Sequence, residues 1–316
     1  MKKEDIFRKC ATPTSVGGQA VIEGVMMKGP DAMAIAVRKP DGEIAIKKDP
    51  VKAKKKSSFK KLPLVRGVFA LVESMILGVT SLTYSAEFWD DGSEAGEKSK
   101  LELWIEKKFG DKADDIYIGF SVFIALAAAI LLFIITPTIV TNFLRKIITN
   151  TFFLNVVEGV FRIGLFIGYV AVISKMKDIQ RVFQYHGAEH KTIHCYEAGQ
   201  ELTVENVRKF TTLHPRCGTS FLVIVMVISM ILFSVIGWPN PWMRILSRFI
   251  FLPVVAGLSY EVIKWAGKSD SQLVYAISYP GLLLQKMTTR EPDDRQIEVA
   301  IAAMMSVVEE GKEDDL

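Results

Sequence analysis

The residues best suited to chemistry are concentrated in one short segment of this 316-residue chain. All 4 histidines and two of the 3 cysteines lie between positions 186 and 217. Neutral imidazole and thiolate together favour zinc, although iron also accepts them. The concentration therefore predicts a divalent metal site, with zinc as the expected ion. The candidate ligands are His186, His190, His194, His214 and Cys217.

The spacing of the histidines favours a helix that presents several ligands on one face. At about 100° per residue, His186, His190 and His194 share a narrow face with Glu197. Residues 186–190 also match the pattern H-x-x-E-H, in which two histidines bind zinc and the glutamate activates water. Glu189 is therefore the candidate catalytic residue. The third ligand would come from the remaining histidines or from Cys217.

Other ionisable groups are weaker candidates for the same site. These are Glu197, Glu261, Cys195, Glu158, Arg162 and Glu23. Glu158 and Arg162 are four residues apart in an apolar segment, where such groups either face a polar interior or neutralise each other. Glu261 lies near the end of a later apolar segment and could reach the histidines. Glu23 is the one charge in the first strand-like run, either aimed at the site or exposed.

The elements that position these residues include long apolar segments. Apolar residues make up 50% of the chain and the mean hydropathy is +0.26, although 23% of residues are charged. Residues 116–144 and 217–243 carry no charge and exceed the roughly 20 residues that cross a bilayer. A soluble globular protein is therefore excluded. The odd number of cysteines excludes a secreted disulfide framework, and residues 1–18 lack the apolar core of a signal peptide.

The expected fold is mainly α, a polytopic helical membrane protein with a small N-terminal β-rich unit. Four spans are expected, within residues 116–144, 152–173, 218–238 and 245–265, the first kinked near Pro137. Residues 63–89 could be interfacial, re-entrant or a poor span, and residues 271–284 are expected to be re-entrant or interfacial. The expected divisions are 1–62 (β-rich unit and basic linker), 63–110 (interfacial helices and polar linker), 111–286 (membrane domain with the histidine loop 174–217) and 287–316 (C-terminal helix and acidic tail).

Charge in the loops predicts the orientation. The 174–216 loop holds seven lysines and arginines, whereas residues 145–151 hold two and residues 239–247 hold one. The positive-inside rule then places this loop and both termini in the cytoplasm, with the protein in the cytoplasmic membrane. The lysine-rich residues 47–61 are either a solvated linker or a surface for anionic lipid. Nucleic acid is not an expected partner, because the run lacks interleaved aromatic residues apart from Phe59.

Two functions fit these features. The first is a metal-dependent hydrolase that acts at the cytoplasmic face on a membrane-associated substrate, either a lipid or a membrane-embedded peptide. The alternative is a transporter, or a factor that handles membrane proteins or lipids, with a structural metal. An open coordination position favours the enzyme, and a shell closed by four protein ligands favours the alternative.

Four blocks of the sequence also resemble a known family. They are residues 17–27, 185–197, 213–221 and 288–294. Together they are similar to the YqhQ-like bacterial multi-pass membrane proteins, which are predicted metal-dependent enzymes of unknown function. The resemblance extends over about residues 12–305. It implies metal chemistry at His186, Glu189, His190, His194, His214 and Cys217, and it brings no substrate with it.

Overall fold

The structure is a computed structural model that describes residues 14–51, 62–89, 104, 108, 110, 113–236, 240–266 and 272–308. It forms two compact units. The first unit contains Met1–Trp89, Ile167–Ile228 and Leu252–Leu316, and the second contains Asp90–Phe166 and Ser229–Phe251. Cys10, residues 52–61 of the lysine-rich segment, most of residues 90–112 and the acidic tail lie outside the described residues. The predicted fold class is confirmed: the chain is mainly helical, with a small N-terminal sheet.

The sheet has four antiparallel strands that follow one another in chain order. They are β1 (Gly17–Val21), β2 (Gly24–Lys28), β3 (Ala32–Arg38) and β4 (Ile44–Pro50). The first apolar run, expected to be one strand-like segment, is two strands joined by a tight turn at Ile22 and Glu23. Glu23, the second residue of this turn, adopts a φ of 51°, in the left-handed region that non-glycine residues enter mostly in turns. Residues 40–42, Pro-Asp-Gly, lie in the turn that separates β3 from β4.

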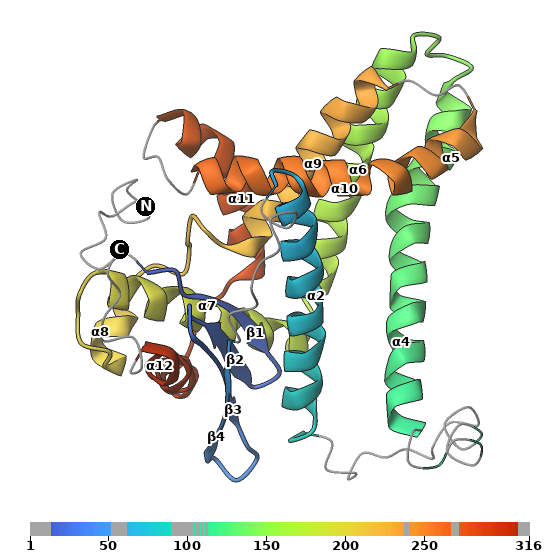
Figure 1. The fold of residues 1–316 in the computed structure, drawn as a ribbon. Helices are drawn as coiled ribbons and strands as arrows, with labels where there is room; N and C mark the ends of the chain where they lie inside the picture. The colour runs from blue at the N-terminus through green and yellow to red at the C-terminus, as the bar shows by residue number, and fades with distance from the viewer. Residues whose placement is uncertain are drawn as a thin grey trace. The chain divides into compact units, whose positions relative to one another are not determined.

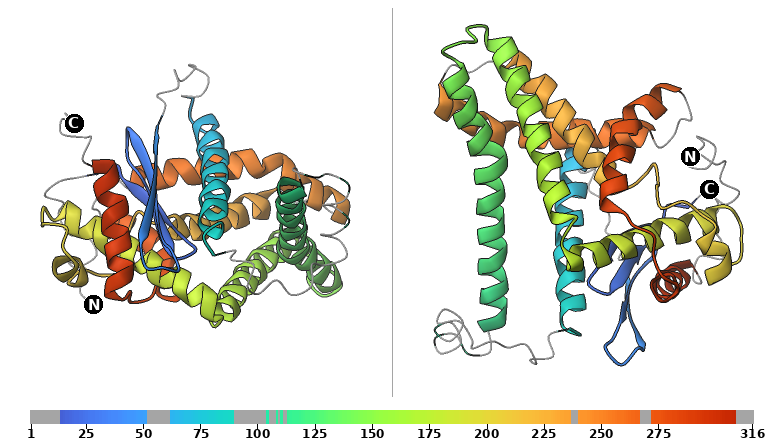
Figure 2. Two further views of the ribbon diagram at one scale, coloured as in Figure 1. Left: turned by 90° about the horizontal axis from the view of Figure 1, so that it is seen from below. Right: turned by 180° about the vertical axis from the view of Figure 1, so that it is seen from behind.

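Both faces of the sheet are covered by helices. Alternate residues of β3 point to opposite faces, so Ala34 and Ala36 pack with α7 (Lys177–Glu197) and α12 (Asp294–Val308). Ile35 and Val37 form a second cluster against Leu77, Tyr84 and Phe88, in and just after α2 (Val65–Ala86). Figures 1 and 2 show the strands between α12 and α2. Burial on both faces explains why β2 and β3 are continuously apolar.

Helices α7 and α12 belong to the same hydrophobic core as the sheet. The expected C-terminal helix is confirmed as α12, and its Ile297 and Met304 are fully buried. The short helix α8 (Val204–Arg208) follows α7, and α11 (Gln272–Thr288) precedes α12. Residues 271–284 were expected to be re-entrant or interfacial, and residues 272–288 form a continuous helix despite Pro280. Helix α7 therefore packs in one core with both the sheet and α12.

Five helices of the described residues are long and apolar enough to cross a membrane. They are α2, the segment Ile116–Leu144, α6 (Thr151–Ile173), α9 (Gly218–Val235) and the Trp242–Trp265 part of α10 (Pro241–Ala266). Four of them correspond to the expected spans, and the fifth, α2, is the segment that the sequence left open. These helices are compatible with a multi-pass membrane protein.

The predicted irregularity near Pro137 is present in the second unit. Helix α4 (Ala113–Ile130) continues into the π-helical turn η3 (Leu131–Ile135) and then into α5 (Thr136–Leu144). Proline has no N–H to donate to the preceding turn, which loosens the helix at this point. The Nε atom of Arg162 donates to the carbonyl oxygen of Phe133 at 2.9 Å. A buried arginine thus takes part in the backbone bonding of the distorted turn.

Candidate metal centre

Helix α7 presents the histidines on one buried face, as their spacing predicted. The helix runs through Lys177–Glu197 without a break, and Glu189, His190, His194 and Glu197 are all buried. The rings form a continuous row. The centroid of His186 lies 4.4 Å from that of His190, His190 lies 5.6 Å from His214, and His214 lies 4.5 Å from His194. The loop before α9 therefore brings His214 into the row on α7.

The ligand atoms separate into two sets. We call His186, His190 and Cys217 the first ligand group, and His194, Glu197 and His214 the second ligand group. Within each group, one ligand atom from each residue lies within 4.8 Å of those from the other two. Three ligands at such distances could converge on one ion after small rotamer adjustments, since zinc binds imidazole nitrogen at about 2.0–2.1 Å and sulfur at about 2.3 Å.

Backbone carbonyls orient the rings of the first ligand group. The Nδ1 atom of His186 lies 2.8 Å from the carbonyl oxygen of Thr288, and Nδ1 of His190 lies 2.5 Å from that of Thr212. Metal-binding histidines usually donate one ring N–H in this way, which fixes the tautomer and frees the other nitrogen for the ion. Here the other nitrogen of His186 lies 3.2 Å from Sγ of Cys217.

Two buried polar atoms beside the first ligand group have no hydrogen-bond partner among the residues that the structure describes. They are Nε2 of His190 and Oε2 of Glu189. Buried polar groups are nearly always paired, and leaving one unpaired costs about 1–3 kcal/mol. Both atoms are potential metal or water ligands. Their lack of a partner fits a site that is completed by an ion and its water.

Glu189 reaches this position because β1 passes very close to α7. A Cβ atom on Gly18 would lie 2.8 Å from both Cδ and Oε1 of Glu189. The backbone N–H of Gly18 donates a hydrogen bond to the Glu189 carboxylate, whereas burial raises the pKa of this carboxyl group. Gly18 is therefore needed for its small size, and the strand fixes one carboxylate oxygen.

The second ligand group is already internally paired. Glu197 forms an ion pair with Arg216, and its Oε2 lies 3.7 Å from Nε2 of His214. Nε2 of His194 lies 2.9 Å from the carbonyl oxygen of Leu213. Burial lowers the pKa of His194 to about 4 and that of His214 to about 3. Both rings are therefore neutral at pH 7 in this environment.

In the first ligand group, His186 and Cys217 stabilise each other's charged forms. Burial raises the pKa of Cys217, but the nearby His190 and His186 outweigh this effect and hold it well below its usual range. Burial alone would lower the pKa of His186, but the Cys217 sulfur raises it to about 9. The chain thus favours a thiolate at position 217, which is the form that binds metal.

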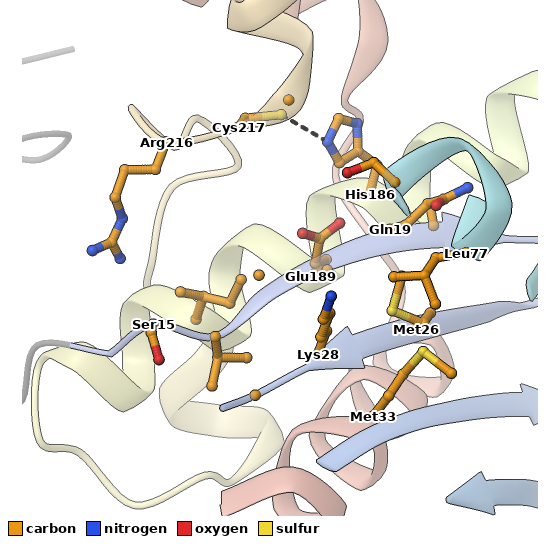
Figure 3. A pocket seen from close by; sticks show the side chains of 18 of the residues that line it. Ser15, Gln19, Met26, Lys28, Met33, Leu77, His186, Glu189, Arg216 and Cys217 are labelled. Atoms are coloured by element: carbon orange, nitrogen blue, oxygen red, sulfur yellow. Dashed lines mark hydrogen bonds between the residues drawn. The ribbon is translucent and has the colours of Figure 1, made fainter. Parts of the chain in front are cut away.

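A pocket of about 1310 Å³ opens onto the site. Figure 3 shows the Glu189 carboxylate projecting into it below the paired side chains of His186 and Cys217. Met26 and Leu77 supply an apolar wall, from the sheet and α2 respectively. Charged side chains at the same pocket are the cationic Lys28 and Arg216 and the acidic Asp31, Asp49 and Glu73. The pocket therefore combines an apolar wall with charges of both signs next to the candidate ligands.

The structure places two of the weaker candidates, Glu261 and Glu23, away from both ligand groups. Glu261 forms an ion pair with Arg66. It is not one of the described residues that line the pocket. Glu23 is neither exposed nor in the pocket. It is buried at the hairpin turn, paired with Arg181 and 3.1 Å from the hydroxyl of Tyr185.

Cys195 and the Glu158–Arg162 pair also lie outside both ligand groups. Cys195 is packed in the hydrophobic core, where burial raises its pKa to about 11. Glu158 and Arg162 form the expected i,i+4 ion pair at 3.0 Å, inside the second unit. Glu197 alone among the weaker candidates belongs to a ligand group.

Several residues that support the site were missed by the sequence reasoning. The buried side chain of Gln285 accepts from the N–H of His214 at 2.9 Å and donates to its carbonyl at 2.8 Å. Gly187 packs so tightly that an added Cβ would collide with the carbonyl oxygen of Arg290. No local pattern identifies Gln285, because its partner lies far away in the sequence. Gly187, by contrast, could have been singled out from the sequence, because it stands inside the H-x-x-E-H segment.

Comparison with known proteins places the chain in a family. The family described as "Protein of unknown function (DUF1385)" matches residues 62–310. The chain belongs to this family. It is also 38% identical over 303 residues to "Uncharacterized protein YqhQ" of Bacillus subtilis (strain 168), covering 93% of this chain and 92% of that protein. The predicted YqhQ-like resemblance is thereby confirmed. No solved structure matches the chain.

Proposed function

We propose that this member of the DUF1385 family is a membrane-embedded, zinc-dependent hydrolase whose ion is held by the first ligand group. The observation that carries the proposal is the pair of orphaned buried atoms, Nε2 of His190 and Oε2 of Glu189. They lie on the helix that also carries His186, and Cys217 supplies a thiolate from the opposite wall. The chemistry of this donor set fits zinc.

The first ligand group is a better metal site than the second because Nε2 of His190 has no hydrogen-bond partner among the described residues. Nε2 of His186 and Sγ of Cys217 are paired with each other, and an ion could replace that contact. In the second ligand group, the carboxylate of Glu197 is instead neutralised by Arg216. An ion there would compete with an arginine for the same carboxylate. We therefore infer one ion per chain, with the second ligand group serving to support His190.

Three protein ligands leave one tetrahedral position open, which is the arrangement of catalytic rather than structural zinc sites. A zinc ion supplies Lewis acidity that makes water a nucleophile at neutral pH. Glu189 is the base that would accept the proton of that water at Oε2, while the backbone N–H of Gly18 donates to the same carboxylate.

The pocket favours a substrate with an apolar chain and a polar or charged group. Met26, Met33 and Leu77 would contact the apolar part. The polar part would meet charged side chains of both signs, namely Lys28, Arg216, Asp31, Asp49 and Glu73. Lipids and membrane-embedded peptides have this composition. The alternative is a transporter or a lipid-handling factor with a structural metal, and it requires a fourth protein ligand to close the shell.

Metal analysis tests the proposal. Full-length protein purified with zinc is expected to hold about one ion per chain by elemental mass spectrometry. The variant Glu189→Gln is expected to keep the ion but to lose zinc-dependent hydrolysis of membrane lipids or peptides, by roughly 10²–10⁴-fold. Wild-type protein without stoichiometric metal would overturn the proposal. An ion with four protein ligands, seen by X-ray absorption, would favour the structural alternative.

The shared core also supports a specific membrane topology. The sheet and α7 pack in one hydrophobic core, so they lie on the same side of a membrane. The chain between them must then cross an even number of times. It contains three candidate spans, with mean hydropathies of 1.6 for α2, 2.9 for Ile116–Leu144 and 2.0 for α6. We infer that the two most apolar segments cross and that α2 does not.

Four crossings result, because α9 and α10 form a second pair before the chain returns to α12 in the same core. The sheet, α7 and α12 then share one side, which we infer from the loop charges to be the cytoplasm. Helix α2 packs one face on the sheet and exposes Val72, Met75 and Ile76 on another. That exposed face is suited to the membrane surface.

Cysteine labelling tests this topology. Cysteines introduced by Leu62→Cys and Glu87→Cys, at opposite ends of α2, are both expected to resist a membrane-impermeant maleimide in intact cells and to react after lysis. Thr149→Cys, in the loop between α5 and α6, is expected to react in intact cells. Labelling of the two α2 positions from opposite sides would contradict the inference, since it would require α2 to cross.

A further inference from the structure

The second unit contains a buried cluster with more positive than negative charge. Glu158 is 1% exposed at its side chain, and three arginines surround it: Arg162, Arg244 and Arg248. Nη2 of Arg162 lies 3.0 Å from the carboxylate and Nη1 of Arg244 lies 3.4 Å from it, and Arg248 forms the third ion pair. One carboxylate thus faces three guanidinium groups.

The cluster is built from helices of the candidate membrane domain. Glu158 and Arg162 come from α6, whereas Arg244 and Arg248 come from the first turns of α10. Asn155 of α6 ties this helix to α10 and to α9, because its Oδ1 accepts from Arg244 at 2.6 Å and its Nδ2 donates to the carbonyl of Phe233, in α9, at 2.8 Å. The charges are therefore part of a fixed arrangement.

Arg248 has hydrogen-bond donors that no acceptor among the described residues uses. Its side chain is 9% exposed and its guanidinium lies 4.9 Å from the ring centroid of Phe233. In the described part of the chain, its Nε and Nη1 atoms are buried without a hydrogen-bond partner. Buried donors without acceptors are unfavourable, and more so when they belong to a charged group. An anion with several acceptor oxygens would satisfy the donors of Arg248.

We propose that the cluster around Glu158 binds a phosphate group through Arg248, with Arg162 and Arg244 supplying the surrounding positive charge. Guanidinium groups match the geometry of phosphate oxygens and bind them in pairs of hydrogen bonds. Arg244 and Arg248 follow Pro241 by three and seven residues, roughly 5 and 10 Å along α10. That depth lies close to the headgroup region of a bilayer, where lipid phosphates are found.

Binding to the full-length protein in detergent tests the proposal. Two arms distinguish the source of the phosphate group: titration with inorganic phosphate at constant ionic strength, followed by thermal unfolding, and retention of phosphatidylglycerol against phosphatidylcholine by native mass spectrometry. Saturable binding of either probe supports the proposal and names the source. Arg248→Gln is expected to weaken binding about tenfold to hundredfold, as for loss of a charged hydrogen bond.

Lys146→Gln is the matched control, because it removes one positive charge from an exposed side chain of the same unit. It is expected to leave affinity almost unchanged. Arg248→Lys keeps the charge and loses the paired donors, so it should bind with intermediate affinity even if the glutamine variant folds poorly. Absence of saturable binding by the wild-type protein in both arms, or equal affinity of wild type and Arg248→Lys, would overturn the proposal. Metal content should be the same in all variants.

Discussion

Replacement of His190 with alanine is expected to abolish stoichiometric zinc binding. The ring is 1% exposed, Thr212 holds its Nδ1, and Nε2 has no partner among the described residues. Loss of a partner that merely orients a ligand typically weakens metal affinity by about 10–100-fold, and loss of the ligand itself should exceed that range. Elemental analysis and competition with a chromophoric chelator would measure the change.

The two cysteines of the site region provide the matched comparison. Cys217→Ala removes the thiolate that lies 3.2 Å from His186 and should reduce zinc binding as His190→Ala does. Cys195→Ala makes the same chemical change in the hydrophobic core, outside both ligand groups, and should keep the ion. Equal metal content in the two cysteine variants would argue against the first ligand group as the binding site.

Replacement of Gly187 with alanine is expected to destabilise the protein, although alanine is the better helix former by about 1 kcal/mol. The added Cβ would collide with the carbonyl oxygen of Arg290 and lie 3.2 Å from Cγ2 of Thr212. Overpacking of this kind costs about 1–3 kcal/mol. The collision also displaces the segment whose Thr288 carbonyl orients His186, so zinc affinity should fall.

Thermal unfolding in detergent would measure the stability change, and Gly168→Ala is the control. Gly168 lies within α6, and a Cβ there would meet nothing within 4 Å. That variant should therefore be neutral or slightly more stable than wild type. The opposite signs expected at two helical glycines separate a steric contact from general helix propensity. If Gly187→Ala proved more stable than wild type, the Arg290 segment would have moved away from the new Cβ without a cost in the free energy of folding.

The apolar segments and the helix of the histidines were predictable because both depend on local patterns. Length and hydropathy identified four spans, and a 3.6-residue period placed His186, His190, His194 and Glu197 on one face. The π-helical turn before Pro137 follows from a missing N–H, which is also a local property. The sequence left α2 open because its composition suits a span, an interfacial helix and a packed helix equally.

The sequence by itself determined which residue types gather on α7 and in the loop before α9. Tertiary structure alone decided which of them lie within reach of one another: Cys217 joins His186 and His190, whereas His214 joins His194 and Glu197. It also gave Glu23 and Glu261 arginine partners, Arg181 and Arg66, from distant segments. Helical periodicity depends on neighbouring residues, but these pairings depend on how separate segments pack, which no local pattern encodes.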